Sequence, residues 1–188
     1  GNRHSTRLTC IFYEIDDLPI DKQWEALFQL VTDTGLIPVA VVFTGGKSLH
    51  VYFATEDLSQ EQWLTLMRLL TIRQNSDPAI CNVGRAMRLP GVPRVKNGET
   101  REVGLGEVNL SAPRYTYNEL FSLLGGDKLP YGLDDDRWRR WRAAKSPAEK
   151  IQALHAAPSV PVVTYAPRTD SAVVSGRVSI FDLIPSTL

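Results

Sequence analysis

The chain has 188 residues, of which 43% are hydrophobic and 22% charged, and its 21 basic side chains balance 21 acidic ones. This composition is typical of a soluble globular protein with one domain, or with one domain and a small appendage. Zero net charge weighs against a protein that only coats nucleic acid, and the sequence shows neither a signal-peptide core nor a membrane-spanning run of about 18 apolar residues, so we expect a cytoplasmic protein.

Along the first part of the chain, the sequence predicts strands that alternate with helices. The strands are rich in β-formers, and the helices carry apolar residues at helical spacing. We expect the first helix to pack through a face that includes Leu27 and Phe28, and Ser59 to open the second helix with a capping box. The predicted elements are a strand over residues 8–15, a helix over 21–33, a strand over 38–44, a strand over 49–54 and a helix from Ser59.

Further along, the sequence predicts a hairpin and then a helical part. Two strands, over residues 88–95 and 100–105, are joined across Asn97-Gly98, which is a strong hairpin signal. The later predictions are helices that begin after Thr116, Asp134 and Ser146, a strand over 161–165 and an apolar tail over 178–184. The expected division of the chain is a core over residues 1–112, a helical appendage over 113–158, and a strand with an extended tail over 159–188.

The sequence Thr-Gly-Gly-Lys-Ser-Leu-His at residues 44–50 predicts a strand end, a tight glycine turn and a second strand. Alternate side chains of a strand share a face, so Ser48, His50 and Tyr52 should point one way. The bare backbone amides of the turn suit an anion such as a triphosphate. A P-loop is excluded, because Val41 stands where its first glycine would fall and a strand follows instead of a helix. The alternative is an ordinary hairpin with one incidental histidine.

Glu14 lies in the first predicted strand and Asp16 directly after it, two residues on, so their carboxylates should share a face if the strand alternation continues. Two such carboxylates repel each other unless a divalent cation lies between them. Mg²⁺ and Mn²⁺ prefer hard oxygen ligands, often completed by substrate phosphates. The alternative is a solvated strand end. Asp17 leaves the register open, because Asp16 and Asp17 cannot both face one site.

A third acid and two arginines follow. Asp77 precedes Pro78, which favours an extended backbone at Asp77. Arg85 and Arg88 flank a short apolar segment, from which both guanidinium groups are able to bind phosphates in bidentate fashion. Asp77 is alternatively a turn residue or a helix cap, and the arginines alternatively form surface salt bridges.

The order of these motifs resembles the archaeo-eukaryotic primase superfamily, in particular the primase-polymerases of plasmids, phages and other mobile elements. In that family the first motif is two acids separated by one residue, the second is a small residue, any residue and then His, and the third is an Asp after an apolar or small residue. The resemblance covers residues 8–110, and one departure is Glu14, where the family most often has Asp. The motifs fall on Glu14 with Asp16, on Ser48 with His50, and on Asp77.

This resemblance implies a fold and a set of roles. The fold would be of the α/β (α+β) class, with an antiparallel or mixed sheet related to the RNA-recognition fold, flanking helices and a small C-terminal helical region. Glu14, Asp16, His50 and Asp77 would be catalytic, and the three acids would hold Mg²⁺ or Mn²⁺. The residues implied to bind the nucleotide are Lys47, Ser48, His50, Arg85 and Arg88, and those expected to bind nucleic acid are Arg94, Lys96, Arg101, Arg137 and Arg140.

The implied activity is metal-dependent nucleotidyl transfer from nucleoside triphosphates, which makes or extends primers on a single-stranded DNA template of a mobile element, with unwinding left to a separate helicase. Two alternatives stay open. One is a catalytically degenerate primase fold, suggested by Glu14, that binds single-stranded DNA in replication initiation; the other is a structural module that binds no nucleotide. Likewise, Trp138 and Trp141 either stack on bases or form the core of an amphipathic helix with a solvated arginine face.

Overall fold

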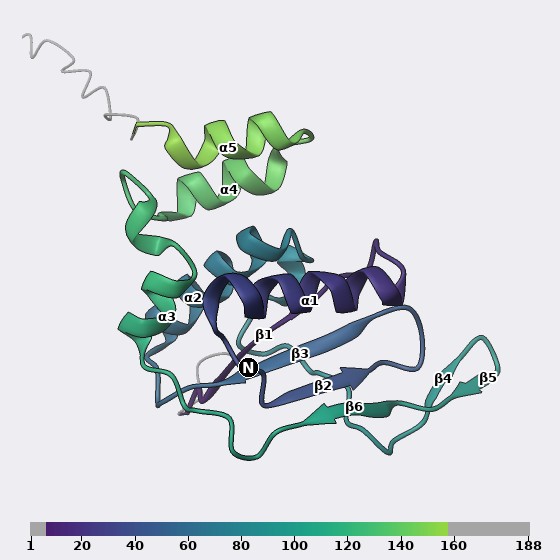
Figure 1. The fold of residues 1–188 in the computed structure, drawn as a ribbon. Helices are drawn as coiled ribbons and strands as arrows, with labels where there is room; N and C mark the ends of the chain where they lie inside the picture. Colours follow the sequence, from purple (N-terminus) through teal and green to yellow (C-terminus); the bar gives the residue numbers. More distant parts are fainter. Residues whose placement is uncertain (1–6, 158–188) are drawn as a thin grey trace, which may run out of the picture. The chain divides into compact units, whose positions relative to one another are not determined.

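Four strands form an antiparallel sheet in the order β1-β3-β2-β6 in the computed structural model, which describes residues 7–157 (Figure 1). β3 lies between β1 and β2 and runs antiparallel to both, so β1, α1 and β2 make a split β-α-β unit. The mixed α/β class with an antiparallel sheet, expected from the sequence, is confirmed. The strands are β1 (Cys10–Glu14), β2 (Ala40–Phe43), β3 (Leu49–Ala54) and β6 (Gly104–Val108).

Helix α1 (Ile20–Thr34) packs on the sheet through Leu27 and Leu30, which are buried in the same core as the apolar side of β3 (Figure 1). The helix ends at Gly35, whose left-handed φ of 71° lets its N–H bond to the carbonyl of Val31. The expectation for Phe28 is wrong, because its side chain is 64% exposed. The sheet takes the face with Leu27 and Leu30, so Phe28 is left on the outside.

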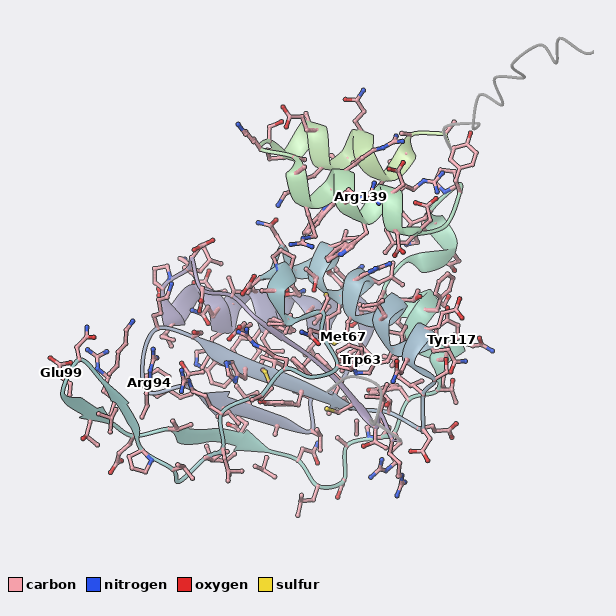
Figure 2. All side chains as sticks on the ribbon, turned by 180° about the vertical axis from the view of Figure 1, so that it is seen from behind. Trp63, Met67, Arg94, Glu99, Tyr117 and Arg139 are labelled. Atoms are coloured by element: carbon pink, nitrogen blue, oxygen red, sulfur yellow. The ribbon has the colours of Figure 1, made fainter. Side chains whose placement is uncertain are left out.

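Helix α2 (Gln60–Gln74) covers the outer edge of β1, and its Trp63 and Met67 lie between the two elements (Figure 2). The Trp63 indole N–H donates to the carbonyl of Cys10 at 2.8 Å, and the N–H of Phe12 donates to the Met67 sulfur at 3.4 Å. These bonds satisfy edge groups that would otherwise be open to another chain. The capping box predicted at Ser59 is present.

The hairpin predicted across Asn97-Gly98 forms, with both turn residues at positive φ, but its strands are short. They are β4 (Arg94–Lys96) and β5 (Glu99–Arg101), a separate two-stranded sheet. The strand expected over 88–95 is absent before Arg94, because Pro90 and Pro93 lack the N–H of a ladder and Gly91 turns the chain with φ 79°. The segment expected over 100–105 divides, and its last residues begin β6 in the main sheet.

The helical part has its own small core, in which Trp138 and Trp141 stack with ring centroids 5.3 Å apart on Ala153 and Leu154. Both tryptophans are buried, as in the amphipathic-helix alternative. Cys81 is among the residues that pack against this core and also against the main one. The helices are α3 (Tyr117–Leu123), α4 (Asp135–Ala143) and α5 (Pro147–His155), with short 3-10 turns η2 (Pro78–Ile80) and η3 (Gly126–Lys128).

The predicted strand over 161–165 and the apolar tail over 178–184 lie outside the described residues. Within residues 7–157, no helix combines the length and the apolar character that crossing a membrane requires.

Candidate active site

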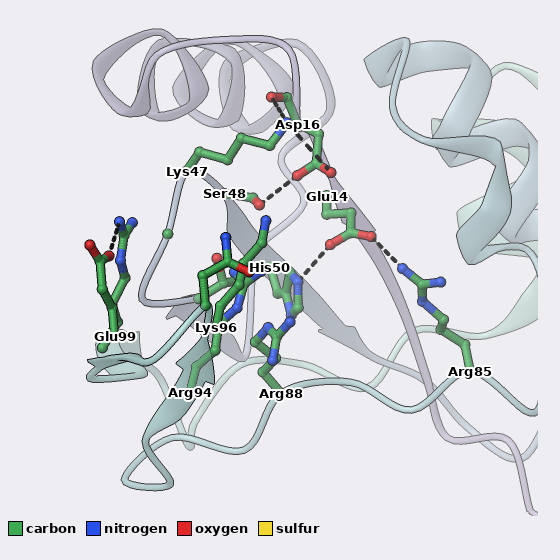
Figure 3. A pocket seen from close by; sticks show the side chains of 14 residues that line it. Glu14, Asp16, Lys47, Ser48, His50, Arg85, Arg88, Arg94, Lys96 and Glu99 are labelled. Carbon is green, nitrogen blue, oxygen red and sulfur yellow. Dashed lines mark hydrogen bonds and ion pairs between the residues drawn. The ribbon is translucent and has the colours of Figure 1, made fainter.

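Ten of the residues singled out from the sequence line one pocket of about 470 Å³ (Figure 3). They come from four separate segments: the end of β1, the turn and first residues of β3, the loop before β4, and the β4–β5 hairpin. The fold therefore brings together side chains that are up to 87 positions apart. These ten residues are Glu14, Asp16, Lys47, Ser48, His50, Arg85, Arg88, Arg94, Lys96 and Arg101.

Glu14 and His50 form the buried floor of the pocket. They are register partners on β1 and β3, so their side chains lie on the same face of the sheet. The His50 Nε2 donates to Glu14 Oε2 at 2.7 Å, and the residues are only 6% and 4% exposed. Arg85 reaches in from the loop after η2 and donates to the other oxygen, Oε1, at 3.0 Å. Both oxygens of the buried carboxylate are thus held by nitrogen donors.

These contacts keep Glu14 ionised. The hydrogen bond from His50 is the largest cause that lowers the pKa of Glu14, the charge of Arg85 acts in the same direction, and burial opposes them. On the other side of the ring, the Tyr52 hydroxyl lies 3.4 Å from His50 Nδ1. Burial raises the pKa of Tyr52, so its hydroxyl stays protonated and is able to donate to Nδ1 in the tautomer that carries the proton on Nε2.

Asp16 lies at the rim of the same pocket and accepts hydrogen bonds from Lys47 and Ser48, the two residues after the glycine turn. The Ser48 hydroxyl donates to Asp16 Oδ1 at 2.6 Å, and Lys47 Nζ donates to the Asp16 backbone carbonyl at 2.8 Å. Asp17 is exposed and does not line this pocket, so the register that the sequence left open places Asp16 at the pocket.

The glycine turn is closed on one side by the β4–β5 hairpin. A Cβ at Gly45 would meet the backbone carbonyl of Glu102 at 2.5 Å, and a Cβ at Gly46 would meet the Arg94 guanidinium at 2.9 Å. Gly45 also has a φ of 70°, which disfavours other residues. The two glycines therefore allow the hairpin to approach the turn and to bring its basic side chains over the pocket.

Positive charge dominates the pocket. Its lining has six lysine or arginine side chains and only three carboxylates, those of Glu14, Asp16 and Glu99. A hollow with this balance suits a ligand with several negative charges, and a triphosphate is one of that kind. The six cations are Lys47, Arg85, Arg88, Arg94, Lys96 and Arg101.

Asp77 does not join the other two acids in this pocket. Its N–H donates to the Glu14 carbonyl at 3.2 Å, which fixes its backbone beside the end of β1. Its carboxylate instead accepts from the Ala79 N–H at 2.8 Å and caps η2, which is the alternative that the sequence left open. The side chain lines a neighbouring hollow with Asp16 and Asp17.

In residues 7–157, no three His, Cys, Asp or Glu side chains are grouped as metal ligands, so the expected three-carboxylate cage is not formed. The chemistry of the remaining donors still fits a hard divalent ion. Magnesium is commonly held by one or two carboxylates together with substrate phosphates, and Glu14 and Asp16 lie beside the basic cluster that suits those phosphates.

Two of the arginines expected to bind nucleic acid lie elsewhere. Arg137 is 2% exposed and donates to the carbonyls of Tyr131 and Ala156 and to the Asp134 carboxylate. Because the guanidinium group is buried and hydrogen-bonded within the protein, it is not accessible to a phosphate. Arg140 is paired with Asp136 on the same helix.

One residue that the sequence reasoning missed is Gln23 of α1. Its buried amide donates to the carbonyls of Leu18 and Lys47 at 2.7 and 2.6 Å, and its oxygen accepts from the N–H of Leu49 at 2.8 Å. Gln23 therefore ties the turn after β1 to the Lys-Ser segment. The sequence did contain a signal for a buried polar contact, because Gln23 lies four residues before Leu27 and so on the apolar face of the helix. Thr44, the first residue of the 44–50 motif, also lines the pocket, although no role was predicted for it.

The structure is similar to two solved structures. The primase-polymerase (AEP domain) of cyanophage S-2L matches with a TM-score of 0.55 at 26% identity, over 66% of this chain and 64% of that one. The primase RepB' matches with a TM-score of 0.51 at 19% identity, over 66% of this chain and 42% of that one. The chain thus spans less than two thirds of the length of either structure. No protein-family model and no curated protein sequence matches it.

Proposed function

Since this chain has the fold of archaeo-eukaryotic primase-polymerases, we propose that it is a metal-dependent nucleotidyltransferase that makes or extends primers on single-stranded DNA. The observation that carries the proposal is the pocket itself. It sets two carboxylates, Glu14 and Asp16, beside six basic side chains where β1 ends and β3 begins. Both solved structures that share the fold are named as primases.

In this proposal the pocket binds the triphosphate of the incoming nucleotide. Lys47, Arg85 and Arg88 neutralise its oxygens, and Ser48, just before β3, and His50, on β3, lie beneath it. The arginines and Lys96 of the hairpin close the open side or contact the template. Transfer joins the primer 3′ oxygen to the α-phosphorus and releases pyrophosphate, whose growing negative charge the basic cluster stabilises.

Glu14 and Asp16 are the residues that would hold a divalent ion, Mg²⁺ or Mn²⁺. When bound, such an ion supplies Lewis-acid polarisation of the phosphate and lowers the pKa of an attacking hydroxyl. Gln23 positions the Lys47–Ser48 segment so that Asp16 and the phosphate-binding residues keep their separation.

The test is incorporation of labelled nucleotide on a primed single-stranded template with Mn²⁺. We expect Asp16→Asn to lose about a hundredfold or more of the wild-type rate, the effect typical of removing one transition-state contact. Asp17→Asn is the matched control, because this adjacent acid is exposed and outside the pocket. Equal rates for Asp16→Asn and the wild type would contradict the proposal.

A second function is favoured by one observation. Both oxygens of Glu14 are already paired with nitrogen donors, and the described residues form no three-ligand metal group. This arrangement suits a primase fold that binds single-stranded DNA without catalysis. Fluorescence anisotropy with labelled oligonucleotide separates the two, since binding without any incorporation in Mn²⁺ or Mg²⁺ supports this second function.

A further inference from the structure

The buried carboxylate of Glu14 has two partners that differ in how easily they leave. The side chains of Glu14 and His50 are 7% and 5% exposed, and both are fixed on paired strands. The Arg85 side chain is 39% exposed and extends from a loop. A long, half-exposed side chain on a loop changes rotamer without disturbing the sheet. Arg85 is therefore the partner that can be exchanged.

A divalent ion that binds Glu14 has to approach a carboxylate oxygen, and a guanidinium beside that oxygen both fills the approach and repels the ion. His50 occupies Oε2 and Arg85 occupies Oε1. Displacing the His50 imidazole would require a side chain that is only 5% exposed to move inside the packed site, whereas displacing Arg85 opens Oε1 on the side of the pocket that Arg85 also lines. The exchange would replace one positive partner of the buried carboxylate by another, so the carboxylate is never left without a counter-charge.

The charge of the pocket determines when this exchange is favourable. A bare divalent cation meets six lysine and arginine side chains against three carboxylates, and Arg85 has no new anion to bind. A nucleoside triphosphate changes both conditions, because its oxygens neutralise the cluster and accept the released guanidinium. The favourable exchange is thus the one in which nucleotide and ion arrive together.

We propose that Arg85 blocks the metal-binding oxygen of Glu14 until a nucleoside triphosphate draws its guanidinium away, so that divalent ion and nucleotide bind as a coupled pair. This inference rests on the proposed function, since it assigns the nucleotide to the same pocket. It gives Arg85 a role beyond contact with phosphates. The residue sets the order of binding and keeps an empty site from taking up metal.

The test is Mn²⁺ binding to the full chain, followed by the electron paramagnetic resonance signal of the free ion, without nucleotide. We expect Arg85→Ala to bind Mn²⁺ about tenfold more tightly than the wild type, or more, since a hydrogen bond to a charged group is worth about that factor. Arg88→Ala is the matched control. It removes the same charge from the same pocket, but Arg88 makes no bond to Glu14 in the described structure.

Adding a non-hydrolysable nucleoside triphosphate should raise the Mn²⁺ affinity of the wild type by a larger factor than that of Arg85→Ala, because linkage requires the coupling to fall when the block is removed. Arg85→Gln, which keeps a polar side chain but is shorter and loses the charge, should behave like Arg85→Ala. Thermal unfolding of each variant confirms that it is folded.

Equal Mn²⁺ affinity of Arg85→Ala and Arg88→Ala without nucleotide overturns the role of Arg85, whatever the protein catalyses. Binding is measured without turnover, so the two proposals fail separately. A chain that gains Mn²⁺ affinity only through Arg85→Ala but incorporates no nucleotide supports the role of Arg85 and contradicts the polymerase activity.

Discussion

The carboxyl group of Glu14 is ionised more readily than that of an exposed glutamate, because His50 and Arg85 both donate to it. Its lowered pKa means that the unfolded chain binds the proton more tightly than the folded one. The stabilisation is then fully present above the unfolded pKa of about 4.3 and is lost as the pH falls through the lower folded value.

We therefore expect Glu14→Gln to be less stable than the wild type by about 1.5–3 kcal/mol at pH 7, the range for hydrogen bonds to charged groups. The difference should shrink as the pH falls below about 4.3, because the unfolded wild type then takes up the proton first and the folded protein follows at its lower pKa. Urea unfolding of both proteins between pH 7 and pH 3 measures it. A difference that stays constant over this range would show that Glu14 is not an ionised partner of His50 and Arg85.

At the residue scale, the sequence identified the chemistry of the site better than its geometry. Glu14 and His50 could be placed from strand alternation, because side-chain direction follows directly from a period of two, whereas Asp16 reaches the pocket from the bend after β1 ends at Glu14. Asp77 and Arg137 could not be placed. A carboxylate before proline caps a turn as readily as it binds metal, and a guanidinium in an arginine-rich helix is buried or exposed according to contacts that only the folded chain supplies.

At the scale of elements, α1 holds the Lys47–Ser48 segment through the single side chain of Gln23. We expect Gln23→Met, which keeps the volume, to cost about 1–3 kcal/mol, because it leaves buried backbone groups unpaired. It should also weaken nucleoside triphosphate binding, measured by calorimetry. Gln29→Met is the control on the same helix, since Gln29 is exposed and its amide bonds to the exposed Asp33 one turn along the helix. Equal nucleotide affinities of the two variants would contradict the positioning role.

The contact between the glycine turn and the hairpin allows a second prediction at this scale. Gly45→Ala and Gly98→Ala both put a Cβ on a residue with positive φ, which costs about 1–2 kcal/mol. Only Gly45→Ala also meets the Glu102 carbonyl, whereas nothing lies within 4 Å at Gly98. Gly45→Ala should therefore be the less stable in thermal unfolding and should bind nucleotide more weakly. Equal losses would mean that the hairpin does not rest on the turn.

Elements with strong local signals were predictable from the sequence. The capping boxes at Ser59 and Thr116 and the Asn-Gly turn depend on residues that are neighbours in sequence. The local sequence pattern is therefore enough to predict them. The fourth strand of the sheet was not predictable in this way. Residues 104–108 pair with β2, which lies more than 60 positions earlier. This pairing depends on contacts that are distant in sequence, so the local pattern does not show that these residues belong to the main sheet and not to the hairpin.

For the molecule as a whole, residues 7–157 contain two hydrophobic cores that share neighbours. Cys81, Leu129 and Leu133 pack against both the main core and the smaller core around Trp138 and Trp141. Two cores joined by common residues are expected to unfold together, because neither can lose its packing without exposing part of the other. The helical part should therefore behave as a structural extension of the sheet domain.

Arg137 tests this coupling, because its buried guanidinium joins α4 to the carbonyl of Ala156 after α5. We expect Arg137→Met to cost about 2–3 kcal/mol through lost charge-assisted bonds, seen as one calorimetric transition at a lower temperature. The affinity for single-stranded DNA, and its salt dependence, should stay unchanged. Arg139→Met, at a 75% exposed side chain that pairs with Asp136 on the same helix, should alter stability by no more than about 0.5 kcal/mol. A separate early transition in Arg137→Met would show that the two cores unfold independently, and a weaker salt dependence at unchanged stability would make Arg137 a phosphate contact.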